Sequence, residues 1–276
     1  MAYFRDIFTP HPRPKFWINT FLHLVTPGGF GYVRRLRAMK DESYVHERDK
    51  DPVRHKHHGQ SGWKPEKEGG LSRRDYASYE EYLTHQKLKL DEMVKMKGGF
   101  TGFEIFDYRL KFYARFRHLL GRLPADARIL CCGARQGTEV EVLRDLGFRN
   151  ARGIDLNPGA GNPLVEKGDM MKLDLPDDSL DLLYTNCVDH AFDLEQLLAE
   201  HRRVLKPRGM LLYDIAFNEQ EGAGIWESIE WDRSEDILER LLPLFHAVLR
   251  VERDRHWLWV LMQGKNDAPV AKPQSL

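Results

Sequence analysis

Residues 128–139 read Arg-Ile-Leu-Cys-Cys-Gly-Ala-Arg-Gln-Gly-Thr-Glu, and Gly153-Ile154-Asp155 follows at the end of the next apolar run. A buried strand runs here into a glycine turn and then into a helix. Gly133 and Gly137 let the backbone turn sharply and approach a ligand closely, and the helix that follows adds its positive N-terminal end. Asp155 lies 22 residues after Gly133, where a carboxylate accepts hydrogen bonds from ribose hydroxyls. The stretch predicts a site for an adenosine-containing cofactor.

From Ala127 onward, short apolar runs alternate with amphipathic stretches. We expect strands over Arg128–Cys132, Ala151–Ile154, Leu180–Thr185, Met210–Ile215, Ala247–Val251 and Trp257–Met262. We expect helices over residues 106–120, Glu139–Leu146, Leu194–Val204 and Glu235–Leu242. This alternation indicates a parallel sheet covered on both faces. The last two strands are joined only by Asp254-Arg255-His256, and so short a turn favours an antiparallel hairpin.

The first hundred residues differ in composition from the remainder. We predict that residues 1–100 are an extension or cap and that 101–276 are the main domain. Residues 41–75 are mostly charged, His and Gly, which predicts a long loop. Helices are expected over Phe16–Val25 and from Ser78 onward, where an N-cap precedes an acidic first turn.

The charge of the chain is balanced overall but unevenly distributed. Its 42 Lys and Arg match 42 Asp and Glu, whereas residues 1–98 alone carry 19 basic against 13 acidic side chains. That excess, with the aromatic and basic residues 10–40, is compatible with contact to an anionic membrane surface, although solvated helix faces give the same counts. Zero net charge and the lack of a recognised RNA-binding module argue against nucleic acid. The sequence leaves the oligomeric state open.

The cysteines and histidines give no metal-binding pattern. The three cysteines are Cys131, Cys132 and Cys187, and their spacing suits no metal site, which indicates a reducing compartment. His55-Lys56-His57-His58 lacks Cys or carboxylate partners at ligand spacing, so we predict a solvated loop and no metal. Met1–Thr9 lacks the apolar core of a signal peptide, and a cytoplasmic location is expected.

Further motifs follow the glycine turn in order. They are Gly168-Asp169-Met170, the segment from Leu175 to Asp181, Asn186-Cys187-Val188-Asp189-His190, and Lys206-Pro207-Arg208-Gly209-Met210. With them the chain resembles the class I S-adenosylmethionine-dependent methyltransferases over about residues 105–264. The resemblance implies an α/β fold with a Rossmann-like seven-stranded, mostly parallel sheet, an antiparallel C-terminal hairpin strand, and here a mainly helical or irregular N-terminal extension. It also implies S-adenosylmethionine as cofactor.

Two positions depart from the family pattern, in which the first strand ends in Asp and a Gly-x-Gly-x-Gly turn. Cys131 stands where Asp is common, and Arg135 stands at the middle glycine, which leaves less room at the methionine end of the cofactor. The resemblance assigns Asp169 to the adenine amino group and Met170 to the adenine ring. The residues expected to bind the cofactor are Cys132, Gly133, Ala134, Arg135, Gly137, Glu139, Asp155, Leu156, Asp169, Met170 and Asn186.

Candidate catalytic residues follow the fourth strand, at the mouth where the methyl group should lie. An oxygen nucleophile benefits from a base, and we predict His190, with Asp189, for that task. His190 as a pocket or capping residue is an equal alternative, and His85 and Tyr82 on the preceding helix could instead close the pocket. Asn186 does not begin an Asn/Asp-Pro-Pro-aromatic motif, which similar enzymes use to methylate base or amide nitrogens. Its absence favours an oxygen atom as the methyl acceptor.

The sequence therefore predicts O-methylation of a small molecule or glycan, with residues 1–100 as a lid or cap. One alternative is a nicotinamide-dependent oxidoreductase on a similar sheet. Gly133-x-Arg135-x-x-Thr138 does not satisfy Gly-x-Gly-x-x-Gly, which disfavours it. Another alternative is a non-catalytic relative that binds a cofactor or a protein partner.

Overall fold

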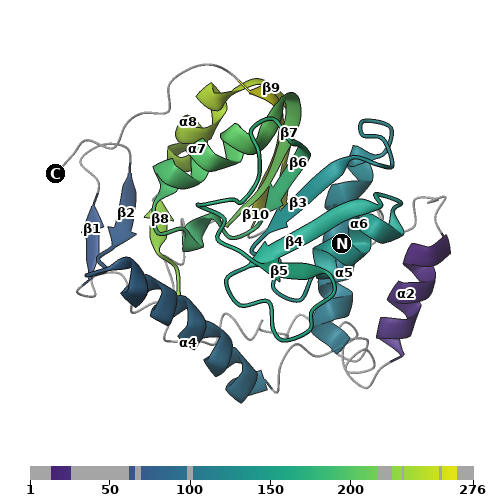
Figure 1. Ribbon diagram of the computed structural model, residues 1–276, viewed down its shortest axis with the longest axis horizontal. Helices are drawn as coiled ribbons and strands as arrows, with labels where there is room; N and C mark the ends of the chain where they lie inside the picture. The colour runs from purple at the N-terminus through teal and green to yellow at the C-terminus, as the bar shows by residue number, and fades with distance from the viewer. Residues whose placement is uncertain are drawn as a thin grey trace, which may run out of the picture.

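A seven-stranded sheet forms the centre of the protein (Figure 1). The computed structural model describes residues 14–25, 62–65, 70–97, 102–216, 226–231, 233–254 and 257–265. The sheet has the order β5-β4-β3-β6-β7-β10-β9. Its strands are β3 (Arg128–Cys132), β4 (Asn150–Asp155), β5 (Val165–Lys167), β6 (Leu180–Thr185), β7 (Leu205–Ala216), β9 (Phe245–Asp254) and β10 (Trp257–Lys265). The first five run parallel, and β10 is antiparallel to both of its neighbours. The predicted α/β fold and its C-terminal hairpin are confirmed.

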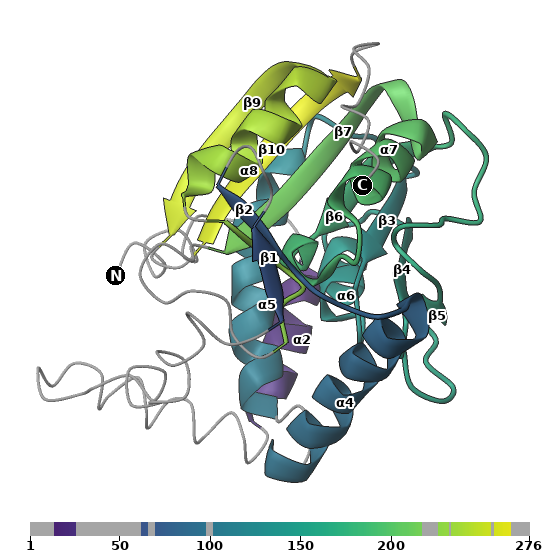
Figure 2. The ribbon, with the colours of Figure 1, turned by 90° about the vertical axis from the view of Figure 1, so that its left-hand side faces the viewer.

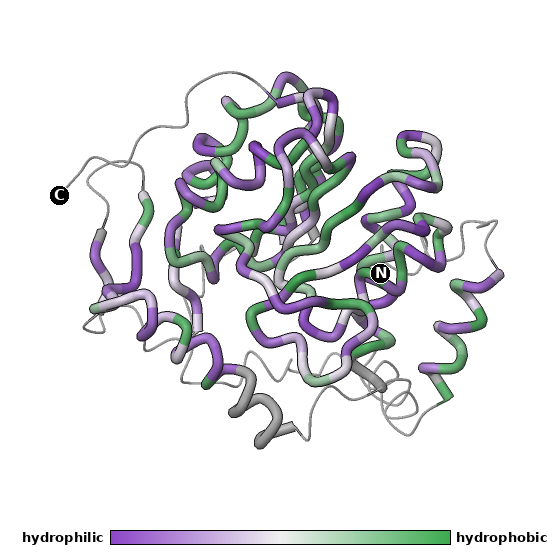
Figure 3. Tube along the Cα trace, in the orientation of Figure 1, coloured by the Kyte–Doolittle hydropathy of each residue, from purple (hydrophilic) through white to green (hydrophobic). Residues whose placement is uncertain are grey.

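Helices cover both faces of this sheet (Figure 2). One face packs against α2 (Pro14–Leu24), α5 (Gly102–Phe116) and α6 (Thr138–Asp145), and the other against α7 (Leu194–Val204) and α8 (Ser234–Leu241). Cys131 packs in the core under α2, α5 and α6, and Cys132 packs in the core under α7 and α8, because successive strand residues point to opposite faces. Apolar residues follow the central strands in Figure 3.

Helix α7 shows how the sequence sets these elements. The side chain of Asp193 caps its first turn by accepting the backbone N–H of Gln196 at 3.0 Å. Leu194, Leu197 and Leu198 lie on one helical face and are fully buried against the sheet. Burial of each leucine stabilises the fold by about 1.5–3 kcal/mol relative to exposure.

A second, three-stranded antiparallel sheet joins distant parts of the chain in the order β1-β2-β8. Its strands are β1 (Trp63–Pro65), β2 (Leu71–Arg74) and β8 (Ile229–Trp231). The prediction of a loop over residues 41–75 is therefore wrong for β1 and β2. Leu71 and Trp231 pair across the sheet and are each 1% exposed, so their apolar contact holds β2 in place.

The helix expected from Ser78 onward is α4 (Tyr79–Lys97), which follows directly after β2. The predicted His55–His58 loop and the 255–256 turn lie outside the described residues. Of residues 10–40, only 14–25 are described, and there Ile18, Phe21 and Leu22 are each more than half exposed. Contact with a membrane surface stays a prediction. No helix in the described part of the chain is long and apolar enough to cross a bilayer.

Candidate functional site

A pocket opens at the carboxyl ends of the parallel strands, where sheets of this type bind ligands. It contains about 650 Å³ of space not filled by protein atoms, part of it open to solvent. Its walls come from the segments after β3, β4, β5 and β6 and from α4. The lining residues are Tyr82, Gln86, Lys89, Gly133, Arg135, Asp155, Leu156, Asn157, Gly168, Asp169, Met170, Cys187 and His190.

The glycine turn after β3 has the conformation that its sequence predicts. Gly133 and Gly137 have φ of 70° and 85°, in the left-handed region that glycine enters at little cost. A side chain at Gly133 would also overlap the Sγ of Cys187. Arg135 has φ of 45°, so this departure from the family pattern keeps a glycine-like backbone at a cost of roughly 1–2 kcal/mol.

Asp155 ends β4 beside this turn. Its Oδ2 accepts the backbone N–H of Arg135 at 2.9 Å, and its Oδ1 accepts that of Asn157 at 2.7 Å. An ionised carboxylate offers about four lone-pair sites. These two bonds therefore fix the carboxylate against the pocket and leave about two sites for a vicinal diol.

Asp169 presents a second carboxylate to the pocket. Its Oδ1 accepts the backbone N–H of Met171 at 2.8 Å, and its Oδ2 accepts the hydroxyl of Tyr79 at 2.5 Å. Burial, with the negative Asp169 nearby, raises the pKa of Tyr79, which remains a neutral donor. Helix α4 thereby reaches the same carboxylate that the family resemblance assigns to adenine.

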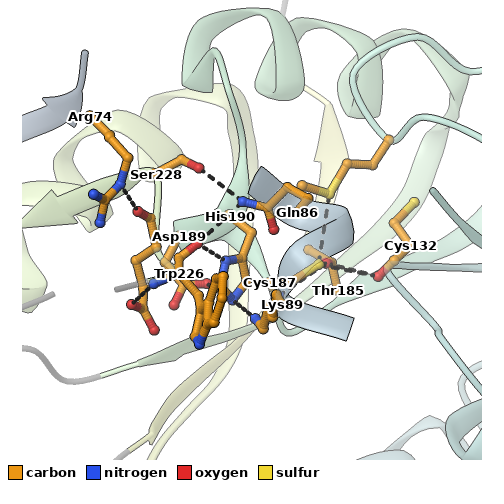
Figure 4. Close-up of polar contacts among 12 residues, drawn as sticks. Arg74, Gln86, Lys89, Cys132, Thr185, Cys187, Asp189, His190, Trp226 and Ser228 are labelled. Atoms are coloured by element: carbon orange, nitrogen blue, oxygen red, sulfur yellow. Dashed lines mark hydrogen bonds and ion pairs between the residues drawn. The ribbon is translucent and has the colours of Figure 1, made fainter. Parts of the chain in front are cut away.

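A polar cluster faces the pocket from the segment after β6 and from α4 (Figure 4). The Nδ1 of His190 lies 3.0 Å from the carbonyl oxygen of Trp226, and its Nε2 lies 2.6 Å from the Nζ of Lys89. A carbonyl oxygen only accepts, so Nδ1 carries the proton and Nε2 is the acceptor. Burial and the adjacent Lys89 hold the pKa of His190 well below its usual value.

Two carboxylates complete the cluster. The Oδ1 of Asp189 lies 3.9 Å from the Nε2 of His190, and burial, followed by the charge of Glu227, raises the pKa of Asp189. Arg74 of β2 donates from Nε to the carbonyl oxygen of Glu227 at 2.9 Å. The second sheet therefore anchors the segment from Trp226 to Ser228 beside the pocket.

The structure brings together about half of the predicted site residues. Those that line the pocket are Gly133, Arg135, Asp155, Leu156, Asp169, Met170 and His190. The predicted residues outside the lining are Cys132, Ala134, Gly137, Glu139, Asn186 and Asp189. Of these, Glu139 is buried in the first turn of α6, and that burial raises its pKa to about 8.

Sequence reasoning missed Gln86, Lys89 and Asn157. It quoted Gly168 and Cys187 within motifs without assigning them to the site, and it gave Tyr82 only as an alternative. Three of these six residues share a helical spacing. Tyr82, Gln86 and Lys89 are spaced by four and three residues, which places them on one face of α4. Asn157 and Cys187 adjoin predicted residues and have no separate pattern.

Comparison with known proteins identifies the domain. Residues 130–213 match the family model described as a methyltransferase domain. The 1,6-didemethyltoxoflavin-N1-methyltransferase of Burkholderia thailandensis, solved with S-adenosylhomocysteine bound, has a TM-score of 0.56 and 14% identity over 73% of this chain and 99% of its own. The TM-score shows a shared fold. No curated protein sequence matches this chain.

Two further solved structures match with lower TM-scores. A methyltransferase from Thermotoga maritima, described as a possible histamine N-methyltransferase, has a TM-score of 0.46 and 15% identity, covering 67% of this chain and 99% of its own. An S-adenosylmethionine-dependent methyltransferase from Mesorhizobium loti has a TM-score of 0.42 and 19% identity, covering 54% and 97%.

The domain match over residues 130–213, the sheet order and the pocket together support a class I S-adenosylmethionine-dependent methyltransferase. Its cofactor is S-adenosylmethionine, and the donor set fits that molecule. Asp155 can accept from ribose hydroxyls, and Asp169 lies beside the mainly apolar Met170, which suits an adenine. The nicotinamide-dependent oxidoreductase alternative is left without support.

Proposed function

We propose that this enzyme methylates a hydroxyl oxygen of a small molecule or glycan. The observation that carries the proposal is that one pocket is lined both by Asp155 and Asp169, which suit the cofactor, and by the hydrogen-bonded pair Lys89 and His190. S-adenosylmethionine supplies an electrophilic methyl group on a sulfonium. The protein's contribution to such a transfer is chiefly proximity, alignment and management of the acceptor's proton.

On the cofactor side, Asp155 binds the ribose diol and Asp169 accepts from the adenine amino group, with Met170 against the ring. Gly137 stabilises the turn, because its backbone N–H donates a hydrogen bond to the carbonyl of Ala134 at 2.6 Å. A Cβ at Gly137 would lie 2.7 Å from that of Leu164.

Helix α4 serves as the cap over the acceptor. The hydroxyl of Tyr82 donates to the carbonyl of His190 at 3.0 Å, and Gln86 donates to the carbonyl of Trp226 at 3.2 Å. Together with Tyr79 and Lys89, these contacts connect one face of α4 to both ends of the pocket. The proposed cap thus belongs to the extension predicted over residues 1–100.

Two observations favour oxygen over nitrogen as the acceptor atom. The segment after β6 reads Asn186-Cys187-Val188, without the prolines of the planar-nitrogen motif. A neutral hydroxyl must also lose a proton, and the pocket contains the polar groups Lys89 and His190 to receive it. A neutral nitrogen, as in a heterocycle, already has a nucleophilic lone pair and needs no such group.

The test is an acceptor screen that detects released S-adenosylhomocysteine and then locates the new methyl group by mass spectrometry. The panel holds phenols, catechols and sugars against primary amines and nitrogen heterocycles. Methylated hydroxyls support the proposal, whereas products methylated only on nitrogen contradict it. Cofactor binding with no product from any acceptor supports the non-catalytic alternative.

A further inference from the structure

We propose that Lys89, rather than His190, is the residue that takes the proton of the acceptor hydroxyl, and that His190 is the residue that positions Lys89. This inference rests on the proposed O-methylation and names the base at the same site. Lys89 comes from α4, the proposed cap, and its side chain lines the pocket beside Arg135 and His190.

The hydrogen-bond chain sets the direction of the Lys89 amine. His190 donates from Nδ1 to the fixed carbonyl of Trp226, so its Nε2 lone pair accepts one N–H of Lys89 at 2.6 Å. A neutral amine that gives one N–H to His190 retains a second N–H and a lone pair. Since Lys89 lines the pocket, these remaining positions are available to an acceptor.

His190 is poorly suited to be the base in this arrangement. Its Nδ1 lone pair is absent because that atom carries the proton, and its Nε2 lone pair accepts from Lys89. Burial and the neighbouring lysine also hold the pKa of His190 well below its usual value. A group that is so weakly basic gives little driving force for removing a hydroxyl proton.

Burial and the neighbouring groups together bring the pKa of Lys89 close to neutral pH. Lys89 is faced by His190 and Asp189 from the segment after β6, by Cys187 in the same segment, by Glu227 before β8 and by Arg135 from the glycine turn. Burial and Arg135 lower its pKa, and Glu227 and Asp189 raise it. The result is a pKa lowered from 10.5 to about 8, which suits a lysine base near neutral pH.

The proposed step balances without any further reactant. The acceptor's O–H bond breaks and its proton passes to the Nζ of Lys89, while the oxygen forms a bond to the sulfonium methyl carbon. The carbon–sulfur bond breaks and its electron pair stays on sulfur, giving S-adenosylhomocysteine. Lys89 leaves the step as an ammonium next to Asp189 and Glu227, where opposite charge stabilises it.

A purely structural lysine would neutralise the same two carboxylates. Asp189, His190 and Glu227 present polar atoms within 4.8 Å of one another, and an ammonium beside them offsets their charge. Lys89→Arg keeps that positive charge but stays protonated at all working pH values. Lys89→Met removes both charge and base and keeps an unbranched side chain. The two variants therefore separate the roles.

The first arm of the experiment measures turnover with phenol and with para-nitrophenol, which is largely ionised at about pH 8 and needs no base. We expect Lys89→Arg and Lys89→Met each to lower kcat for phenol by about 10²–10⁴-fold, to lower it far less for para-nitrophenol, and to retain binding of S-adenosylhomocysteine. Lys87→Met, at an exposed position of α4, is the matched control. A Lys89→Arg enzyme with wild-type turnover of phenol overturns the proposal.

The second arm needs no acceptor. The protein is labelled with ¹³C at lysine Cε and saturated with S-adenosylhomocysteine, and the Lys89 signal is assigned by its loss in Lys89→Met. A titration midpoint close to 8 supports the proposal, whereas a midpoint near the ordinary 10.5 overturns it. If neither phenol is methylated, the acceptor screen decides the proposed function, and the second arm alone decides whether Lys89 can act as a base.

Discussion

Replacement of Asp155 by alanine tests the cofactor assignment most quantitatively. Two of the carboxylate's lone-pair sites accept backbone N–H groups at 2.9 and 2.7 Å, so about two remain for the ribose hydroxyls. Each hydrogen bond to a charged acceptor contributes about 1.5–3 kcal/mol. The loss of both costs roughly 3–6 kcal/mol, which is about a 10²–10⁴-fold rise in Kd.

Isothermal titration calorimetry with S-adenosylhomocysteine measures this change. Asp155→Asn is the informative intermediate, because its amide keeps one acceptor oxygen and loses the negative charge. We expect its Kd to lie between those of the wild type and Asp155→Ala. Asp174→Ala, at an exposed position outside the pocket lining, is the control. An Asp155→Ala protein that is folded by circular dichroism and binds with wild-type Kd refutes the ribose assignment.

Three further predictions concern the turn and the cap. Burial raises the pKa of Glu139 from 4.5 to about 8. Between these two pH values the carboxyl keeps its proton in the folded protein and loses it in the unfolded chain. The wild type should therefore lose up to about 5 kcal/mol of folding stability as the pH rises from 4.5 to about 8. Glu139→Gln should remove this pH dependence of the unfolding free energy, measured by urea melts at several pH values. If the variant loses as much stability with rising pH as the wild type does, the pKa assigned to Glu139 is wrong. Gly133→Ala should destabilise the fold and weaken cofactor binding, since its methyl would overlap Cys187; a thermal melt and calorimetry identical to the wild type would contradict this. Tyr79→Phe removes the donor to Asp169 and should shift the Kd for S-adenosylhomocysteine less than tenfold, while a loss as large as that of Asp155→Ala would mean that the tyrosine contacts the cofactor itself.

The sequence predicts the main sheet well because local patterns determine it. The apolar runs of β3 and β6 agree with the structure to the residue, and α7 does so through its cap and its helical period. The small sheet is different. Strands β1, β2 and β8 have three or four residues each, and β2 pairs with a strand more than 150 residues away. No periodicity can reveal such a pairing, because it depends on tertiary contact.

The site divides in the same way. Asp155 follows a predicted strand, so its position at the sheet edge could be inferred from the chain. Asp169 follows β5, a strand of three residues that the apolar pattern does not predict, and it is assigned only through the resemblance of Gly168-Asp169-Met170 to the family motif. Lys89 lies in a predicted helix, but nothing local indicates which face of that helix meets the pocket. The hydrogen bond from Lys89 to His190 depends on how α4 packs. The prediction that His190 is the base could therefore not take account of that contact.

A crystal structure of the protein with S-adenosylhomocysteine bound tests the central claim most directly. We predict the ribose hydroxyls within hydrogen-bonding distance of the Asp155 carboxylate, the adenine at Asp169 and Met170, and the sulfur directed toward Lys89 and His190. A ligand outside this pocket, or one inside it with its ribose away from Asp155, would contradict the account.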